Sequence, residues 1–278
     1  MILVTGATGL LGYEVVLKLK QHNIDNVGIG IADLDITDVA AVREYIVFCK
    51  PHSVIHCAAY TAVDKAEDEP ELCMSVNALG TENIAKACRE INAEMIYIST
   101  DYVFDGKGDK PNETGSSRIP LSVYGKSKLA GEESVMRHLE KFYVVRTSWI
   151  FGKNGNNFVK TILKLAETRD EISVVDDQIG SPTYAVDLAV LLCDMAQSEK
   201  YGVYHITNEG FCSWAEFAAE IMRQSKRTCR INPIPSEQYP VKAVRPKNSR
   251  LSKLSLDIAG FVRLPEWQDA LRRYLVCI

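Results

Sequence analysis

The stretch MILVTGATGLLG, residues 1–12, decides the fold of this chain. A short apolar run, Ile2–Thr5, is followed by Gly6, Gly9 and Gly12, and an amphipathic segment begins at Leu10. Glycines at this spacing permit a tight turn and let backbone N–H groups approach a pyrophosphate at the start of a helix. Incidental strand-to-helix turns also contain such glycines. The position directly after an apolar strand favours a dinucleotide-binding loop.

Short apolar runs alternate with amphipathic stretches through the first half of the chain, a pattern typical of crossover units and a mainly parallel sheet. The expected strands are Ile2–Thr5, Val27–Ile31, Ser53–Cys57, Met95–Ser99 and Tyr143–Thr147. The expected helices are Leu10–Gln21, Val39–Cys49, Pro70–Ile91 and Val123–Leu139. We therefore predict an α/β fold with a Rossmann-type, doubly wound parallel sheet, whose ligands bind at the carboxyl ends of the strands.

Beyond about residue 150 the alternation becomes less regular, which suggests a second, smaller unit. Thr183–Ala196 still has the pattern of a helix and Gly202–Ile206 that of a strand, so both are expected to rejoin the main sheet. The predicted division is an NAD(P)-binding Rossmann domain of residues 1–148 plus about 183–207, and a smaller C-terminal α/β substrate-binding lobe of about 149–182 and 208–278.

Composition excludes several classes of protein. The 278 residues include 32 Lys and Arg against 36 Asp and Glu, a formal charge of −4, so no basic field would gather nucleic acid. No apolar run approaches the roughly 18 residues that cross a bilayer, and Met1 leads directly into the first strand, so we expect a cytoplasmic protein with no membrane partner. Eight scattered cysteines without zinc-like spacing predict reduced thiols.

Acidic residues follow the second expected strand, where ribose hydroxyls are bound in dinucleotide folds. Asp33 and Asp35 both qualify, and capping the turn before Thr37 is an equally good role for either. No Lys or Arg lies between positions 21 and 42 to receive a 2′-phosphate. The absence of a cation in this segment therefore favours NADH over NADPH as the cofactor.

Two other strand ends carry candidate groups. Ala58 and Ala59 leave room for a flat adenine or ribose to lie across the backbone, although small residues also pack sheets. Ser99 and Thr100 end the fourth strand and place hydroxyls at the same sheet edge. A turn-capping role fits these hydroxyls equally well.

Tyr124 and Lys128 lie four residues apart at the start of an expected helix, and therefore on one face. A free tyrosine has a pKa of about 10, and a nearby ammonium and a cationic nicotinamide both favour its anion. A phenol tuned in this way can exchange a proton with a carbonyl or hydroxyl oxygen while hydride moves to or from carbon. A pair at this spacing is often only a solvated helix face, but the upstream glycine loop and Thr100 favour a catalytic pair.

Motifs along nearly the whole chain resemble, in order, those of the extended short-chain dehydrogenase/reductases, and most closely the dTDP-4-dehydrorhamnose reductase family. After the glycine loop they are Leu34–Thr37, Ala58–Asp64, Asn77–Thr81, Ser99–Phe104, Tyr124–Lys128, Arg146–Trp149, Gly155–Phe158, Asp177–Thr183 and Arg245–Leu251. The resemblance implies NAD(P)H-dependent reduction of the C4 keto group of a nucleotide-linked 6-deoxy-4-hexulose, from dTDP-4-dehydro-L-rhamnose to dTDP-L-rhamnose.

The resemblance also implies roles for individual residues. Tyr124 matches the proton donor to the C4 oxygen, Thr100 the group that polarises this oxygen, and Lys128 the residue that holds the nicotinamide ribose. The positions that match the NADPH or NADH cleft are Gly6, Gly9, Leu10, Leu11, Gly12, Asp35, Ile36, Ala58, Ala59, Tyr60, Ser99, Tyr124 and Lys128. Those expected to contact the dTDP-linked substrate are Thr100, Asp101, Trp149, Asn157, Arg245 and Arg250. Asn77 matches an asparagine that supports the Tyr–Lys helix through a water.

The chain departs from related patterns at two places. Tyr102 stands where sugar-nucleotide 4,6-dehydratases carry glutamate, which disfavours elimination of water. Glu14 matches one glutamate ligand of a magnesium ion found at the dimer interface of some bacterial members, but Val186 occupies the position of a second. We therefore expect no metal site and favour a monomer, with a homodimer left open.

Alternatives stay open at this stage. Trp149 also fits a core aromatic, and Arg245 and Arg250 also fit a surface segment. A reductase of a different nucleotide-4-keto sugar would share every catalytic residue. A non-catalytic regulatory subunit resembling that of methionine adenosyltransferase is a further possibility, disfavoured because a scaffold has no need for a tuned phenol such as Tyr124.

Overall fold

A computed structural model describes all 278 residues and contains a central sheet of six parallel strands. The strand order is β10-β5-β4-β3-β1-β2. The bounds are β1 (Ile2–Thr5), β2 (Asn26–Ile29), β3 (Ser53–His56), β4 (Glu94–Thr100), β5 (Phe142–Thr147) and β10 (Gly202–His205). The predicted Rossmann-type α/β fold is therefore confirmed, with strand ends shifted by one or two residues.

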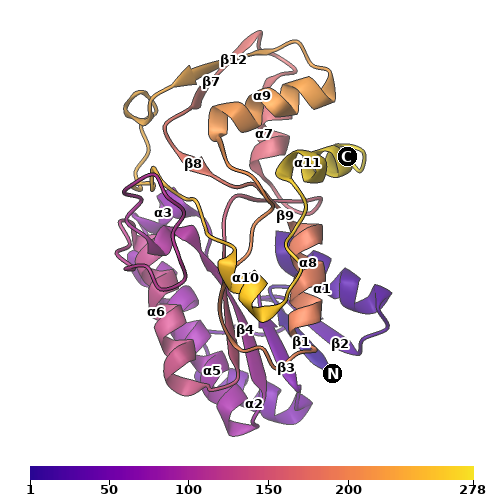
Figure 1. Ribbon diagram of the computed structural model, residues 1–278. Coiled ribbons are helices and arrows are strands. Elements are labelled where there is room, and N and C mark those ends of the chain that lie inside the picture. Colours follow the sequence, from indigo (N-terminus) through magenta and orange to yellow (C-terminus); the bar gives the residue numbers. More distant parts are fainter.

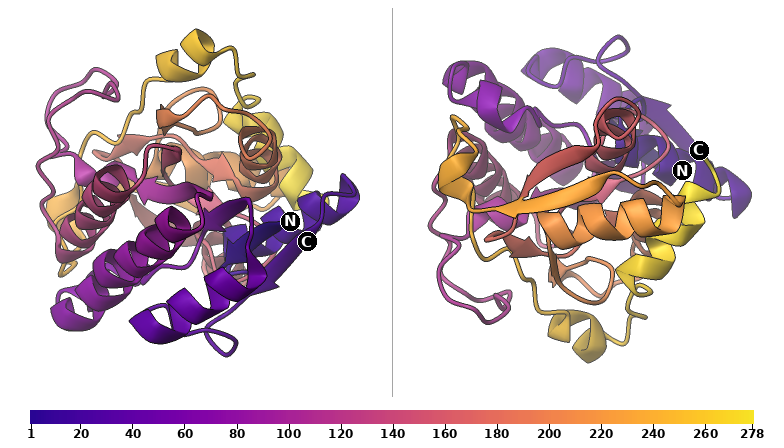
Figure 2. Two further views of the ribbon diagram at one scale, coloured as in Figure 1. Left: turned by 90° about the horizontal axis from the view of Figure 1, so that it is seen from below. Right: turned by 90° about the horizontal axis from the view of Figure 1, so that it is seen from above.

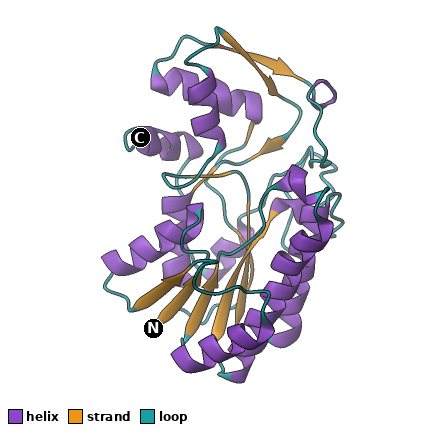
Figure 3. Cartoon of the chain, turned by 180° about the vertical axis from the view of Figure 1, so that it is seen from behind, coloured by secondary structure: helices purple, strands orange, loops and turns teal.

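Helices cover both faces of this sheet (Figures 1 and 3). One face carries α1 (Leu10–Gln21) and α8 (Ala185–Met195), and the other carries α2 (Val39–Cys49), α5 (Thr81–Glu90) and α6 (Val123–His138). Successive residues of β1 serve the two cores, because side chains alternate across a strand. Ile2 and Val4 pack with α1 and α8, whereas Leu3 packs on the opposite face.

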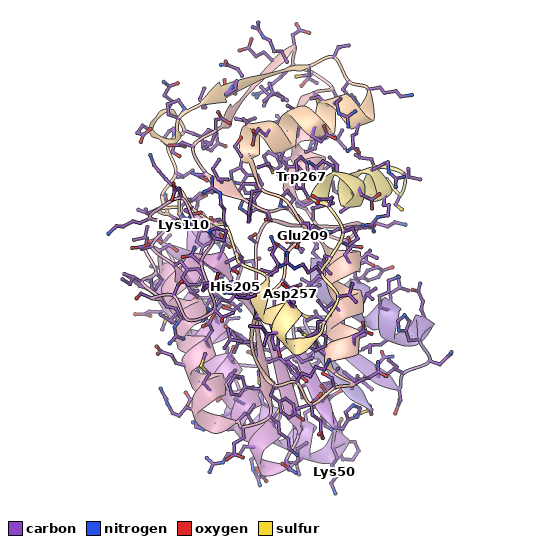
Figure 4. All side chains as sticks on the ribbon, in the orientation of Figure 1. Lys50, Lys110, His205, Glu209, Asp257 and Trp267 are labelled. Carbon is purple, nitrogen blue, oxygen red and sulfur yellow. The ribbon has the colours of Figure 1, made fainter.

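The order of the strands creates a crevice beside β1. Its two neighbours are β2 and β3, so the chain adds strands on one side of β1 and then on the other. Ligands of open α/β sheets bind at such a switch point, outside the carboxyl ends of the strands. Lys50, which precedes β3, marks the opposite, amino edge at the bottom of Figure 4.

Most of the remaining elements lie beyond the carboxyl edge (Figure 1), whereas α10 (Leu254–Ala259) packs beside β10 and buries Leu256 in the core shared with α1 and α8. Their bounds are β6 (Ile150–Phe151), α7 (Phe158–Leu165), β7 (Glu171–Val175), β8 (Ile179–Gly180), β9 (Thr183–Tyr184), β11 (Cys212–Ser213), α9 (Trp214–Ser225), β12 (Arg230–Ile234), η3 (Ser236–Gln238), α10 (Leu254–Ala259) and α11 (Trp267–Leu275). The parallel pair of β7 and β12 runs across α9 (Figure 2). A separate aromatic-rich core includes Phe151, Phe217 and Tyr274.

One predicted helix is interrupted and another begins later. The stretch predicted as Pro70–Ile91 is divided into α4 (Pro70–Met74), a π-helical turn η1 (Ser75–Gly80) and α5, after a short α3 (Val63–Ala66). Such turns occur frequently at functional sites. The helix predicted from Thr183 begins instead at Ala185, because Thr183 and Tyr184 pair with β6.

A buried ion pair fastens α6 to the sheet. Glu132 is 0% exposed and accepts hydrogen bonds of 2.8 Å from Nε and Nη2 of Arg146 on β5. Ser99 donates to the same carboxylate at 2.6 Å, and Arg118 approaches it at 3.2 Å. The Arg146 guanidinium also lies 3.3 Å from Nε2 of His205, which is labelled in Figure 4. These bonds compensate for the removal of both charges from water.

Two further features concern the chain as a whole. All eight cysteines are free thiols, and five of them are buried. No helix combines the length and apolar character needed to span a membrane.

We predict that Arg146→Met lowers the free energy of unfolding by about 3 kcal/mol, because Glu132 loses its buried partner and keeps only the longer contact with the partly exposed Arg118. Urea denaturation measures the change. Replacing both partners, with Glu132→Leu added, should recover much of the loss. The matched control is Arg223→Met, which removes an exposed partner of Glu220 and should change stability little. A single Arg146→Met variant as stable as this control would contradict the prediction.

Candidate active site

The glycine loop closes tightly around the start of α1. Gly6 has φ +66°, and a Cβ there would come within 2.6 Å of the Ala58 backbone nitrogen. A Cβ on Gly12 would lie 2.3 Å from the Gly6 oxygen, so both positions require glycine. Gly9 is the N-cap of α1, and no side chain caps the helix. Its first N–H groups therefore suit an anion such as a pyrophosphate.

Both candidate ribose-binding acids take part in turns. Oδ2 of Asp33 accepts from the Gly30 N–H at 2.8 Å. Oδ1 of Asp35 accepts from the N–H and hydroxyl of Thr37 at 2.9 and 2.7 Å, which lowers the pKa of this carboxyl group. The neighbouring Ile36 is buried. Asp35 is exposed and uses one oxygen in the turn, so its second oxygen remains open to a ligand.

Asn77, in the π-helical turn, ties the loop after β3 to α6. Its Oδ1 accepts from the Tyr60 N–H at 2.8 Å, and its Nδ2 donates to the Tyr60 oxygen at 3.0 Å. The same Nδ2 donates to Oγ of Ser127 on α6 at 2.9 Å. Asn77 therefore contacts the Tyr–Lys helix directly.

Thr100, Tyr124 and Lys128 converge at the carboxyl edge of the sheet. Ser122 caps α6, accepting from the Gly125 N–H at 3.1 Å, and Tyr124 and Lys128 follow one turn apart. The Tyr124 hydroxyl faces Thr100 at the end of β4. Lys128 is 2% exposed, and its Nζ lies 4.2 Å from the centre of the Tyr97 ring.

Burial sets the protonation of this group. Desolvation raises the pKa of Tyr124 well above its usual value, and the negative charge of Asp101 raises it further. Desolvation lowers the pKa of Lys128 to about 7, against the opposing attraction of Glu132. The ammonium was expected to favour a phenolate, but the neighbouring charge that dominates at Tyr124 is that of Asp101. Tyr124 is thus a neutral phenol, the form that donates a proton.

Trp149 is held in an unusual backbone conformation. Its φ is +50°, a region that costs a bulky residue about 1–3 kcal/mol and that clusters at functional sites. Its indole stacks on Trp214, with ring centroids 3.7 Å apart, and a Cβ on Gly180 would come within 2.9 Å of it. The sequence motifs did not single out Trp214 as a neighbour of Trp149 in this site. The capping box of Ser213 and Glu216 could have located it at the start of α9.

A cavity of about 770 Å³ lies between α7, β7 and β12, a volume suited to a small-molecule ligand. Trp214 and Gln178 contribute to its lining, as does Arg245. Arg245 donates from Nη2 to Asp64 of α3 at 2.7 Å, whereas its Nε is buried without a partner. Arg245 therefore connects the lining of this cavity to α3.

Three predicted site residues have their polar groups engaged within the protein. The Ser99 hydroxyl donates to Glu132, so it is not directed to a cofactor. Asn157 caps α7 and donates from Nδ2 to the Gly152 oxygen at 2.8 Å. Arg250 donates from Nη1 to Asn248 at 3.0 Å. Leu11 packs in the core, so any cofactor contact there would come from its backbone.

The parallel sheet, the glycine loop at its switch point and the Thr–Tyr–Lys group together define an extended short-chain dehydrogenase/reductase. Comparison with known proteins gives the family. A family model described as the RmlD substrate binding domain matches residues 1–277. The chain belongs to this family, which confirms the resemblance seen in its motifs.

Individual relatives match this chain over at least nine-tenths of their own lengths. The spore coat polysaccharide biosynthesis protein SpsK of Bacillus subtilis is 41% identical over 274 residues, 99% of this chain and 96% of that protein. The dTDP-4-dehydrorhamnose reductase of Streptomyces griseus is 41% identical over 97% of this chain and 91% of its own. The crystal structure of the Bacillus anthracis dTDP-4-dehydrorhamnose reductase in complex with NADP has a TM-score of 0.97 at 41% identity, covering 100% of this chain and 99% of that one.

We predict that Lys128→Met raises the free energy of unfolding most at pH 7 and below. The folded pKa of about 7 lies under the unfolded value of about 10.4, so below pH 7 the folded state bears the full cost of a buried ammonium. Between pH 7 and 10 the unfolded chain binds more protons, and wild-type stability recovers. The advantage of the methionine variant should therefore shrink over this range in urea titrations.

The matched control is Lys126→Met, whose side chain lies on the exposed face of the same helix. Its difference from wild type should not follow this trend. A Lys128→Met difference that stays constant from pH 6 to 10 would show that the amine is not held neutral by burial.

Proposed function

We propose that this protein reduces the C4 keto group of a nucleotide-linked 6-deoxy-4-hexulose, converting dTDP-4-dehydro-L-rhamnose to dTDP-L-rhamnose with NADPH or NADH. The observation that carries the proposal is the convergence of Thr100, Tyr124 and Lys128 at the carboxyl edge of a sheet whose glycine loop opens α1 without a side-chain cap. Full-length relatives named dTDP-4-dehydrorhamnose reductase, at 36–41% identity, support the choice of sugar.

The residues at the switch point fit a dinucleotide. Backbone N–H groups of Gly9, Leu10, Leu11 and Gly12 would bind the pyrophosphate, and the segments of Asp35–Ile36 and Ala58–Tyr60 would enclose the adenosine. A bound nicotinamide would supply the hydride for C4 of the sugar. Lys128, which is buried beside the Tyr97 ring, would hold a ribose hydroxyl.

The chain's own chemistry is a proton transfer at the C4 oxygen. Tyr124 donates its phenolic proton to this oxygen as negative charge develops there, and Thr100 orients the oxygen by hydrogen bonding. Acid catalysis of this kind contributes about 10²–10⁴-fold to rate. The raised pKa of Tyr124 keeps the proton available until the oxygen becomes basic.

Substrate binding is assigned to the carboxyl edge of the sheet and to the lobe that faces it. We place the sugar between Thr100, Asp101 and Trp149, and the nucleotide in the 770 Å³ cavity, with Arg245 and Arg250 near the diphosphate. Asn157 shapes this lobe from the start of α7. The division is thus a Rossmann domain of residues 1–148 plus about 183–207, and a substrate-binding lobe of about 149–182 and 208–278.

The protein is further proposed to act as a cytoplasmic monomer without a metal ion. The donor set at the position implied by the resemblance is incomplete, because Glu14 has Val186 in place of a second carboxylate. Glu14 is itself buried, which raises its pKa and weakens it as a ligand. Five buried free thiols suit a reducing compartment.

We predict that Tyr124→Phe lowers kcat at least 100-fold while NADPH binding is retained, because only the acid is removed. The assay follows NADPH oxidation by absorbance after addition of dTDP-4-dehydro-L-rhamnose, and cofactor fluorescence reports binding. Tyr45→Phe on α2 is the matched control and should turn over like wild type. A Tyr124→Phe variant with kcat within tenfold of wild type would remove the proposed acid.

Ranking kcat/KM over a panel of nucleotide-4-keto sugars with both reduced cofactors tests the substrate. A preference for another sugar would favour the related reductase activity. No oxidation with any sugar would favour a non-catalytic role.

A further inference from the structure

Asp101 is a buried carboxyl group beside the catalytic threonine. It is 2% exposed and follows Thr100 directly. Its Oδ1 accepts a hydrogen bond of 2.9 Å from the Thr100 hydroxyl. Its Oδ2 is buried and makes no hydrogen bond. A buried carboxylate oxygen without a donor is costly, so this group requires an explanation beyond packing.

The surroundings of Asp101 contain no cation that would stabilise its charge. The phenols of Tyr102 and Tyr124 face it, and its charge raises the pKa of both. Ser249 faces it from the C-terminal segment, and Arg245, beside Tyr102, is held by Asp64. Burial is the main effect and raises the pKa of Asp101 to about 6.

The protonation of Asp101 decides what Thr100 can do. A hydroxyl has one proton to donate. When Asp101 is ionised, the Thr100 proton is directed to Oδ1, and the hydroxyl can only accept from other groups. When Asp101 is neutral, it can donate to Thr100 Oγ1, and the Thr100 proton is free for a carbonyl oxygen. Polarising a carbonyl requires this second arrangement.

We propose that Asp101 is a positioning residue that, as a neutral acid, donates to Thr100 so that Thr100 donates to the substrate C4 oxygen. The inference rests on the proposed reductase function and deepens it. Asp101 keeps its own proton throughout turnover. The C4 oxygen receives its new proton from Tyr124 and its carbon receives hydride from the cofactor, so Asp101 adds a hydrogen bond but no proton.

The test compares the pH dependence of kcat/KM for wild type and Asp101→Asn between pH 5 and 9. An amide can donate to Thr100 but does not titrate. Wild-type kcat/KM should fall on the alkaline side by up to tenfold per pH unit as Asp101 ionises. The variant should be about tenfold slower at low pH, because an amide is the weaker donor, and it should lack this part of the alkaline decline.

Other groups also titrate in this range, above all Lys128, so the diagnostic quantity is the difference between the two profiles. Asp109→Asn, an equivalent change on an exposed loop, should keep the wild-type profile. Circular dichroism and thermal unfolding verify that each variant is folded. A double-mutant cycle adds Thr100→Val, in whose background Asp101→Asn should have no further effect.

Three outcomes separate the possibilities. A flattened profile that depends on Thr100 supports the inference. A folded Asp101→Asn variant that loses more than 100-fold at every pH, or that keeps the wild-type alkaline decline, overturns it while the reductase function stands. Absence of turnover in wild type itself overturns both.

Discussion

The close packing of α6 on β4 is the constraint on which the catalytic group depends. At Gly131 a Cβ would come within 2.3 Å of the Tyr97 hydroxyl and 2.7 Å of the Asn77 backbone oxygen, so the helix can approach this closely only with glycine. The Glu132–Arg146 ion pair fixes the same turn of the helix electrostatically. Tyr124 and Lys128 lie on the preceding turns of this rigid rod, so their distance from Thr100 is set by packing, not by the flexibility of a loop.

Exclusion of water determines the chemistry of this group. Burial disfavours every charge. It raises the pKa of Tyr124 and of Asp101 and lowers the pKa of Lys128, so the neutral form of each side chain is favoured. A neutral phenol beside a neutral or weakly acidic carboxyl group is suited to giving a proton, whereas a phenolate would be suited to taking one. Burial thus favours the protonated phenol that the proposed reduction requires as its acid.

The lobe that faces the carboxyl edge of the sheet is held by aromatic stacking and ion pairing between residues that lie far apart in the sequence. The strained backbone of Trp149 is compensated by its stack with Trp214, which starts a helix 65 positions later in the chain. Arg245 reaches back to Asp64, so the segment that lines the cavity is tied to the short helix after β3.

The sequence by itself determined the parallel sheet, the glycine loop and the pairing of Tyr124 with Lys128, because these follow from local periodicity and from spacing along one helix. It also indicated which strand ends meet at the ligand edge. Only the tertiary structure decided that Ser99 donates to Glu132, that Asn77 contacts Ser127 directly, that the helix after Pro70 contains a π-helical turn, and that Asp101 has an oxygen without a partner. Hydrogen-bond partners and desolvation depend on atoms brought together from distant positions, and no local pattern encodes them.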